Sequence, residues 1–240
     1  MTKIWYGLSG DAWRGVEGHL ADLIRGRNYR RIIELGAGAN PTFTLDFVSD
    51  HGLDYTLLDL SREELGKAPA GYATVCADIC AENLEVAGGY DFAFSRMLAE
   101  HVPDGGRFHR NVYRLLRGGG AAFHFFFLTL FAPPFVANYL LPEWLAERLL
   151  NLLQPGRGKR GRFGKFPAQY SWCRGPLEGQ IRKFESVGFV VEEYAGFFGH
   201  EPYYRKIPLL REFHRWLSLR LSRHPIPWLT SFAQVLLVKK

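Results

Sequence analysis

Acidic residues occur at the ends of three short apolar segments in the first third of the chain. Glu34 lies just before the turn Gly36-Ala37-Gly38, Asp59 ends a second apolar segment, and Asp78 follows a third. If each segment is a strand of a parallel sheet, the three carboxyl groups meet at the edge where open α/β sheets bind ligands. Backbone N–H groups of a glycine-rich turn approach a ligand closely, and carboxylates accept hydrogen bonds from hydroxyl and amino groups. The pattern therefore predicts a ligand site at this edge.

The glycine turn distinguishes between two kinds of cofactor. A dinucleotide site requires a third small residue three positions after the second glycine, and that position is Pro41 here. A pyrophosphate is therefore disfavoured. S-adenosylmethionine contains no phosphate, so a shorter Gly-x-Gly is sufficient, and Glu34 can lie near its cationic end. Asp59 is placed to accept hydrogen bonds from the ribose hydroxyls, and Asp78 to accept one from the adenine amino group.

The segments that position these residues alternate between strand and helix patterns. We expect strands at 29–35, 54–59, 72–77, 90–94, 121–127, 189–194 and 231–238, with helices at 42–51, 107–116, 177–187 and 209–223 and a further helix capped by Ser61 and Glu64. This alternation predicts an α/β fold, with a doubly wound, mostly parallel, seven-stranded sheet.

The alternation breaks after the fifth predicted strand. Residues 128–175 contain paired prolines, an apolar stretch at 135–153 and a basic stretch at 156–165 that has no acidic residue. We interpret 128–175 as a helical and basic insertion within one domain that spans 1–240. The insertion could cap the substrate site or contact an anionic membrane surface, but its prolines and polar residues argue against a membrane span.

Five motifs occur in this order: Glu34-Leu35-Gly36-Ala37-Gly38, Leu57-Leu58-Asp59, Ala77-Asp78-Ile79, Tyr90-Asp91-Phe92-Ala93-Phe94-Ser95 and Leu115-Leu116-Arg117-Gly118-Gly119-Gly120. Through them, residues 28–127 resemble the class I, Rossmann-like family of S-adenosylmethionine-dependent methyltransferases. The resemblance implies that the cofactor is S-adenosylmethionine. It also implies that the cofactor contacts Glu34, Gly36, Ala37, Gly38, Asn40, Asp59, Leu60, Asp78, Ile79, Ser95, Arg96 and Met97.

Two histidines are candidates for a catalytic base, because an imidazole has a pKa near neutrality. His101 follows the fourth predicted strand, where it could act as a base or serve packing. His124 lies within the fifth predicted strand and could face either the crevice or the helix layer. The expected substrate contacts come from the loop after the sixth strand: His200, Tyr203, Tyr204 and Arg205. No spacing typical of metal ligands occurs, so no metal is expected.

The composition leaves several partners open. The net charge of +6 is compatible with nucleic acid, a membrane surface or a phosphorylated ligand, and three cysteines are too few for a disulfide framework. The chain begins with a mixed aromatic and polar segment in which Trp5 and Trp13 could fold over the cofactor or pack an N-terminal helix. We expect a cytoplasmic protein, with peripheral membrane contact through the insertion as an alternative.

The expected function is transfer of a methyl group to a small-molecule, glycan or lipid-linked acceptor, with oxygen as the acceptor atom. One alternative is an RNA-modifying methyltransferase, in which the basic stretch would contact phosphates. Against it, Ser95-Arg96-Met97-Leu98 stands where base-methylating enzymes have an Asn-Pro-Pro-Tyr-like tetrapeptide. Another alternative is a non-catalytic subunit with the same fold.

Overall fold

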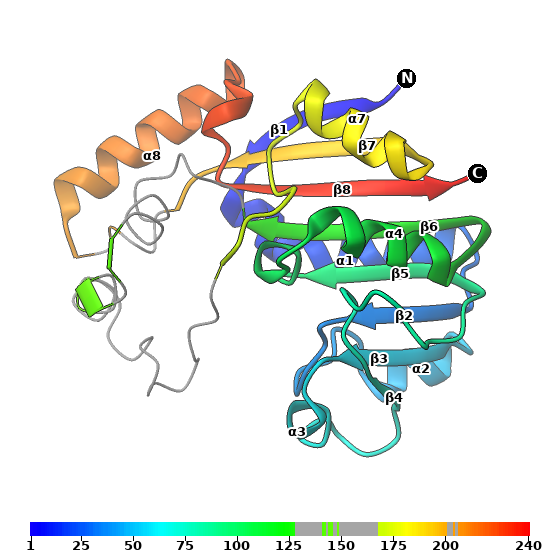
Figure 1. The fold of residues 1–240 in the computed structure, drawn as a ribbon. Coiled ribbons are helices and arrows are strands. Elements are labelled where there is room, and N and C mark those ends of the chain that lie inside the picture. The colour runs from blue at the N-terminus through cyan, green and yellow to red at the C-terminus, as the bar shows by residue number, and fades with distance from the viewer. Residues whose placement is uncertain (128–140, 143, 146–147, 149–167, 201–203, 205) are drawn as a thin grey trace.

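The computed structural model describes residues 1–127, 141–142, 144–145, 148, 168–200, 204 and 206–240 (Figure 1). Its strands are β1 (Lys3–Leu8), β2 (Arg31–Leu35), β3 (Asp54–Asp59), β4 (Ala73–Cys76), β5 (Tyr90–Arg96), β6 (Leu116–Phe127), β7 (Phe189–Phe198) and β8 (Phe232–Lys239). Its helices are α1 (Ser9–Gly26), α2 (Leu45–Asp50), α3 (Arg62–Leu65), α4 (Gly105–Leu115), α7 (Glu178–Val187) and α8 (Pro208–Arg223), and short 3₁₀ turns cover Ala99–His101 and Pro227–Leu229.

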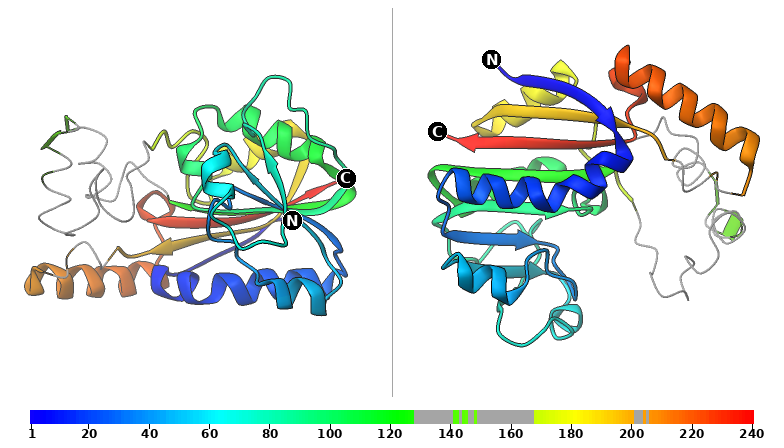
Figure 2. Two further views of the ribbon diagram at one scale, coloured as in Figure 1. Left: turned by 90° about the horizontal axis from the view of Figure 1, so that it is seen from below. Right: turned by 180° about the vertical axis from the view of Figure 1, so that it is seen from behind.

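All the strands belong to one mixed sheet in the order β1-β7-β8-β6-β5-β2-β3-β4. Strand β8 runs antiparallel between β6 and β7, and every other neighbouring pair is parallel. The helices α1 and α2 cover one face of the sheet and α4 and α7 cover the other, as Figure 2 shows. The expected α/β class and mostly parallel, doubly wound sheet are therefore confirmed.

The expected number of seven strands is wrong, because the described residues form eight. The additional strand is β1, which pairs in parallel with β7 at the edge of the sheet, with Lys3 opposite Glu193 and Leu8 opposite Phe198. The indole of Trp5 donates a hydrogen bond of 2.7 Å to the carboxylate of Glu193. Strand β1 passes directly into α1, so no turn separates the two elements in the sequence.

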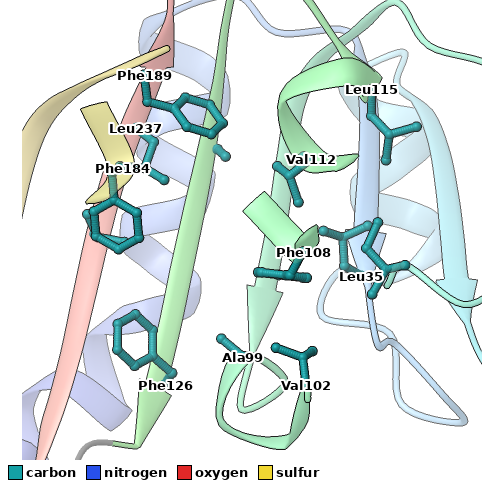
Figure 3. Close-up of a cluster of buried hydrophobic side chains, with 14 of the residues drawn as sticks. Leu35, Ala99, Val102, Phe108, Val112, Leu115, Phe126, Phe184, Phe189 and Leu237 are labelled. Carbon is teal, nitrogen blue, oxygen red and sulfur yellow. The ribbon is translucent and has the colours of Figure 1, made fainter. Parts of the chain in front are cut away.

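The core has two layers, one on each face of the sheet. On one face, the buried side of α4 contributes Phe108, Val112 and Leu115. Figure 3 shows these three side chains on the side of the sheet that also carries Leu35 and Phe126. The other layer is built by the apolar stripe of α1 together with aromatic residues of β5 and β6. Together the layers fix the positions of the strand ends from which the loops after β2, β3, β4 and β5 emerge.

Part of the predicted insertion can be compared with the structure. Residues 168–175 are described and lead into α7, whereas most of the segment 128–167 lies outside the described residues. The boundaries of the insertion therefore stay a prediction. None of the described helices has both the length and the apolar character that crossing a membrane requires.

Candidate functional site

The glycine turn adopts a backbone conformation that side chains rarely tolerate. Gly36 and Gly38 have φ angles of +71° and +53°. A Cβ atom added to Gly36 would lie 2.9 Å from a methyl group of Leu98, and the amide of Gly36 donates a hydrogen bond of 2.7 Å to the carbonyl of Leu58. Positive φ and close packing both require glycine here. The turn is therefore held against β3 and against the segment that follows β5.

Asp59 connects this turn to the end of β3. One carboxylate oxygen accepts a hydrogen bond of 2.9 Å from the amide of Gly38, and the other accepts one of 2.9 Å from the amide of Ser61. A carboxylate can accept about four hydrogen bonds, so capacity remains for ligand hydroxyls. The next side chain, Leu60, is 70% exposed. A polar acceptor and an apolar surface therefore lie side by side next to the glycine turn.

Glu34 is buried beneath the turn and faces protein groups. Its carboxylate accepts a hydrogen bond of 2.9 Å from the amide of Thr42, and it also accepts from the hydroxyls of Thr42 and Tyr55. Burial raises the pKa of this carboxyl group, while the hydrogen bonds and the charge of Arg96 oppose that rise. In this structure Glu34 fixes the chain after the glycine turn. Neither Thr42 nor Tyr55 was identified from the sequence.

The loop after β4 is attached to α4. The carboxylate of Asp78, which is exposed, accepts a hydrogen bond of 2.8 Å from the amide of Cys80. The side-chain amide of Asn111 donates to the carbonyls of Ile79 and Ala81, each over 2.8 Å. Asn111 was not identified from the sequence, although a polar residue among the apolar positions of α4 is a signal for such a contact. The loop leaves Asp78 accessible to a ligand.

The end of β5 carries three residues expected to contact the cofactor. Ser95 is fully buried, and its hydroxyl lies 2.8 Å from Nδ1 of His124. Arg96 has a buried Nε without a hydrogen-bond partner among the described residues. Met97 has a φ angle of +55°, which a residue other than glycine adopts only when its surroundings enforce it. Backbone strain is commonly found at ligand sites. The strain at Met97 and the unpartnered Nε of Arg96 therefore favour these two residues over Ser95 as ligand contacts.

The two candidate bases differ in accessibility. The side chain of His101 is 30% exposed, and its Nε2 lies 3.8 Å from a carboxyl oxygen of Glu100. His124 is completely buried and packs against the rings of Phe108 and His109. Burial lowers the pKa of His124 to about 3, so the ring stays neutral and cannot take up a proton at neutral pH. The side chain of His124 faces the helix layer at α4, and this geometry does not support a catalytic role.

The expected substrate loop is described only in part, since Tyr203 and Arg205 lie outside the described residues. His200 is buried between Ser231, whose hydroxyl is 3.0 Å from Nδ1, and Tyr204, whose hydroxyl is 2.9 Å from Nε2. Nε2 of His214 from α8 is 3.2 Å from Nδ1 of His200. His200 and Tyr204 thus belong to a buried polar cluster rather than to an exposed surface, and His214 was not identified from the sequence.

The sheet register brings the candidate cofactor residues together. Glu34 and Leu35 of β2 lie opposite Leu57 and Leu58 of β3, and Leu35 lies opposite Ser95 of β5. The carboxyl ends of these parallel strands therefore lie side by side, at the left of the sheet in Figure 1. This alignment brings the glycine turn, Asp59 and Arg96 to the same end of the sheet. The part of the chain that the structure describes holds no cluster of three or more His, Cys, Asp or Glu residues able to bind a metal ion.

Comparison with known proteins identifies the domain. Residues 33–124 match the family model described as a methyltransferase domain. Among curated protein sequences, none matches the chain. The phosphoethanolamine N-methyltransferase 2 of Haemonchus contortus, solved with S-adenosyl-L-methionine, is 18% identical with a TM-score of 0.53, and the match covers 92% of this chain and 52% of that one. This chain therefore corresponds to about half the length of that enzyme.

Two further solved structures have the same fold. A protein from Galdieria sulphuraria described as a sarcosine dimethylglycine methyltransferase is 12% identical with a TM-score of 0.57, over 94% of this chain and 85% of that one. The magnesium protoporphyrin IX methyltransferase of Synechocystis, solved with S-adenosylhomocysteine, is 12% identical with a TM-score of 0.53, over 95% and 83%. Residues 33–124 thus match a methyltransferase domain, and the chain shares the fold of methyltransferases solved with S-adenosyl-L-methionine or S-adenosylhomocysteine.

Proposed function

We propose that the chain binds S-adenosylmethionine at the carboxyl ends of β2 to β5 and transfers its methyl group to the oxygen of a small-molecule acceptor. The observation that carries this proposal is the hydrogen bond between the amide of Gly38 and the carboxylate of Asp59. It joins a turn with positive φ angles to the strand-end acid, next to the exposed Leu60. This combination suits a ligand with an amino-acid group, a ribose and a purine.

The proposal assigns a role to each group of residues. The backbone from Gly36 through Asn40 lies against the methionine portion, and Asp59 accepts from the ribose hydroxyls. Leu60 packs on the adenine, which Asp78 and Ile79 contact from the other side. The unpartnered Nε of Arg96 supports a contact to the ligand carboxylate, because a buried donor without a partner is costly. Glu34 holds the turn in place through Thr42.

The chemistry requires alignment and, for a hydroxyl acceptor, removal of one proton. When bound, S-adenosylmethionine supplies an electrophilic methyl group on its sulfonium. Of the two histidines proposed as bases, His101 is the one whose side chain is partly exposed at this edge. We therefore assign proton removal to His101, and to its neutral form. Small-molecule, glycan and lipid-linked hydroxyls are all compatible with this role, as is a cytoplasmic, membrane-peripheral location.

Calorimetric titration with S-adenosylmethionine and S-adenosylhomocysteine tests the assignment of the crevice. Asp59→Ala is expected to weaken both affinities at least tenfold, or about 1.4 kcal/mol. Asp54→Ala is the matched control, because Asp54 lies at the opposite end of β3 in an exposed ion pair with Arg31. Equal affinities for the two variants would contradict the assigned site. Absence of binding to the unmodified chain would leave a non-catalytic subunit as the function.

Transfer of a labelled methyl group to hydroxylated sugars and lipids tests the reaction. His101→Ala is expected to lower kcat while cofactor affinity stays unchanged, because a base acts on the acceptor and not on the cofactor. An unchanged kcat would exclude His101 as the base. Transfer to RNA with none to small hydroxyl compounds would contradict the proposed acceptor class.

A further inference from the structure

Helix α8 presents large apolar side chains to solvent. Leu209, Phe213 and Trp216 are 88%, 58% and 56% exposed. Their spacing of four and three residues places them on one stripe of the helix, and the rings of Phe213 and Trp216 lie 5.8 Å apart. Ile226 and Trp228, in the segment after the helix, are also exposed. An exposed aromatic and aliphatic stripe of this kind indicates an interaction surface.

The stripe is separate from the face by which α8 is attached to the protein. The buried residues of the helix are His214, Ser218 and Leu221. His214 contacts His200, and Ser218 lies close to Gly199 at the end of β7. The helix is therefore anchored by one face while the other face is unpartnered in the described part of the chain. Removing side chains from the stripe leaves the anchoring contacts intact.

Positive charge accompanies the stripe. Residues 206–224 include a single acid, Glu212, and five basic residues: Lys206, Arg211, Arg215, Arg220 and Arg223. The segment 128–167 carries six basic residues and two acids. Each of these two segments thus has a net charge of +4, although the whole chain has only +6, so the remainder of the chain is slightly negative. The charge of the protein is concentrated where apolar residues are also concentrated.

We propose that the exposed stripe of α8 docks on an anionic lipid surface. Trp and Phe side chains favour the boundary between headgroups and acyl chains, and flanking arginines pair with lipid phosphates. The charge pattern opposes a second copy of the helix as the occupant, because two copies of the segment 206–224, each with a net charge of +4, repel one another. An anionic bilayer is complementary to both the charge and the apolar stripe.

The position of α8 brings a docked lipid surface close to the candidate cofactor site. The helix lies beyond the carboxyl ends of the parallel strands, at the same edge as the cofactor loops (Figure 1). In Figure 2 it extends past the sheet on the side of α1. A lipid surface docked on α8 therefore lies next to the edge at which an acceptor enters. The docking itself requires neither cofactor nor catalysis.

Co-sedimentation with phosphatidylcholine vesicles, with and without phosphatidylglycerol, tests the proposal on the full chain. Binding is expected only to the anionic vesicles and is expected to fall as salt rises. The double variant Phe213→Ala, Trp216→Ala is expected to weaken it at least tenfold. Arg215→Glu with Arg220→Glu is expected to do the same by reversing charge. Ile4→Ala, at an exposed apolar residue of β1, is the matched control and is expected to bind as the unmodified chain does.

Several outcomes would overturn the proposal. These are absence of binding to anionic vesicles, equal binding by the Phe213 and Trp216 double variant, or a concentration-dependent dimer in sedimentation velocity that this variant abolishes. The last result would identify the stripe as an interface between two copies. Circular dichroism and S-adenosylmethionine affinity show whether each variant is folded. Because cofactor binding is measured separately, failure of the lipid proposal is distinguishable from failure of the proposed function.

Discussion

The amide of Gly38 donates a hydrogen bond to the carboxylate of Asp59 over 2.9 Å. These residues come from different strand ends, and their contact fixes the distance between the glycine turn and the acid proposed to bind ribose. A Cβ atom on Gly38 would lie 3.6 Å from the same carboxylate oxygen. The backbone of the turn and the acid therefore form one unit, and a change in the turn is transmitted to the ligand site.

Alanine substitutions in the turn are expected to follow the crowding at each glycine. Gly36→Ala places a methyl group 2.9 Å from Leu98 in a backbone of φ +71°, so loss of measurable S-adenosylmethionine binding and a lower Tm are expected. Gly38→Ala meets no contact closer than 3.6 Å and is expected to cost about 1 kcal/mol through its positive φ alone. Calorimetry and thermal unfolding measure both effects.

The control for these variants is Gly18→Ala in α1. Gly18 has an exposed helical position with nothing within 4 Å of the added methyl group. Alanine there is expected to stabilise the helix by about 0.5–1 kcal/mol. If Gly36→Ala were tolerated as well as Gly18→Ala, the packing of Leu98 against the turn would have no role in cofactor binding.

The buried carboxylate of Glu34 gives a prediction about stability. Tyr55→Phe removes one hydroxyl donor from this group and is expected to lower the free energy of unfolding by roughly 1–3 kcal/mol, because a buried acceptor loses a partner. Tyr113→Phe is the control, since the ring of Tyr113 packs on Phe189 and the residue contacts no buried carboxylate. Urea unfolding of the two variants separates the cases. Equal stabilities would show that Thr42 alone satisfies Glu34.

The elements around the candidate cofactor site were largely predictable because their sequence signals are local. Strand β3 has the predicted bounds, since an apolar run ends at an acid there, and Ser61 accepts the hydrogen bond from the amide of Glu64 that the capping pattern predicts. Long-range pairing gives no such signal. Strand β1 pairs with β7, about 190 residues further along the chain, and the sequence of β1 does not indicate which strand it pairs with.

The contacts of a side chain were predictable from the sequence only where a single packing arrangement was possible. Alternation in β6 left two faces for His124, and the packing of Phe108 from α4 decides between them. Glu34 was correctly placed before the turn, but its contacts with Thr42 and Tyr55 depend on how three segments meet. His200 follows β7 as expected, yet α8 covers it with His214. In each case the deciding contact comes from an element distant in sequence.

Acid is expected to destabilise the cluster beneath α8. Burial and the neighbouring His214 lower the pKa of His200 from 6.5 to about 3. The folded state therefore resists protonation, whereas the unfolded state takes up a proton below about pH 6.5. Stability is complete above that pH and is lost as pH falls towards 3, by about 2 kcal/mol at pH 5 for this one residue.

His200→Gln is expected to reduce the loss of stability between pH 7 and pH 5, measured by urea unfolding at each pH. His224→Gln, at an exposed histidine after α8, is the matched control. A pH dependence identical in all three proteins would mean that His200 does not titrate during unfolding. The readout is the change with pH, so a uniform loss of stability in the variant does not affect the conclusion.

The ionisation of Glu100 is expected to change stability with pH in the opposite direction. Its side chain is fully buried, and burial raises the pKa of its carboxyl group from 4.5 to about 8, although hydrogen bonds from the backbone of Glu100 and Phe127 oppose the rise. The folded state keeps the proton while the unfolded state releases it above about pH 4.5. Stability is therefore complete below that pH and is lost as pH rises to about 8, by roughly 3 kcal/mol at pH 7.

Glu100→Gln cannot ionise, so it is expected to gain stability over the unmodified chain at pH 7 to 8 and to match it near pH 4. Glu178→Gln, at an exposed residue of α7 paired with Arg182, is the matched control. Urea unfolding of the three proteins across this range measures the trend, and a Glu100→Gln difference that does not grow with pH would show that Glu100 ionises in the folded protein.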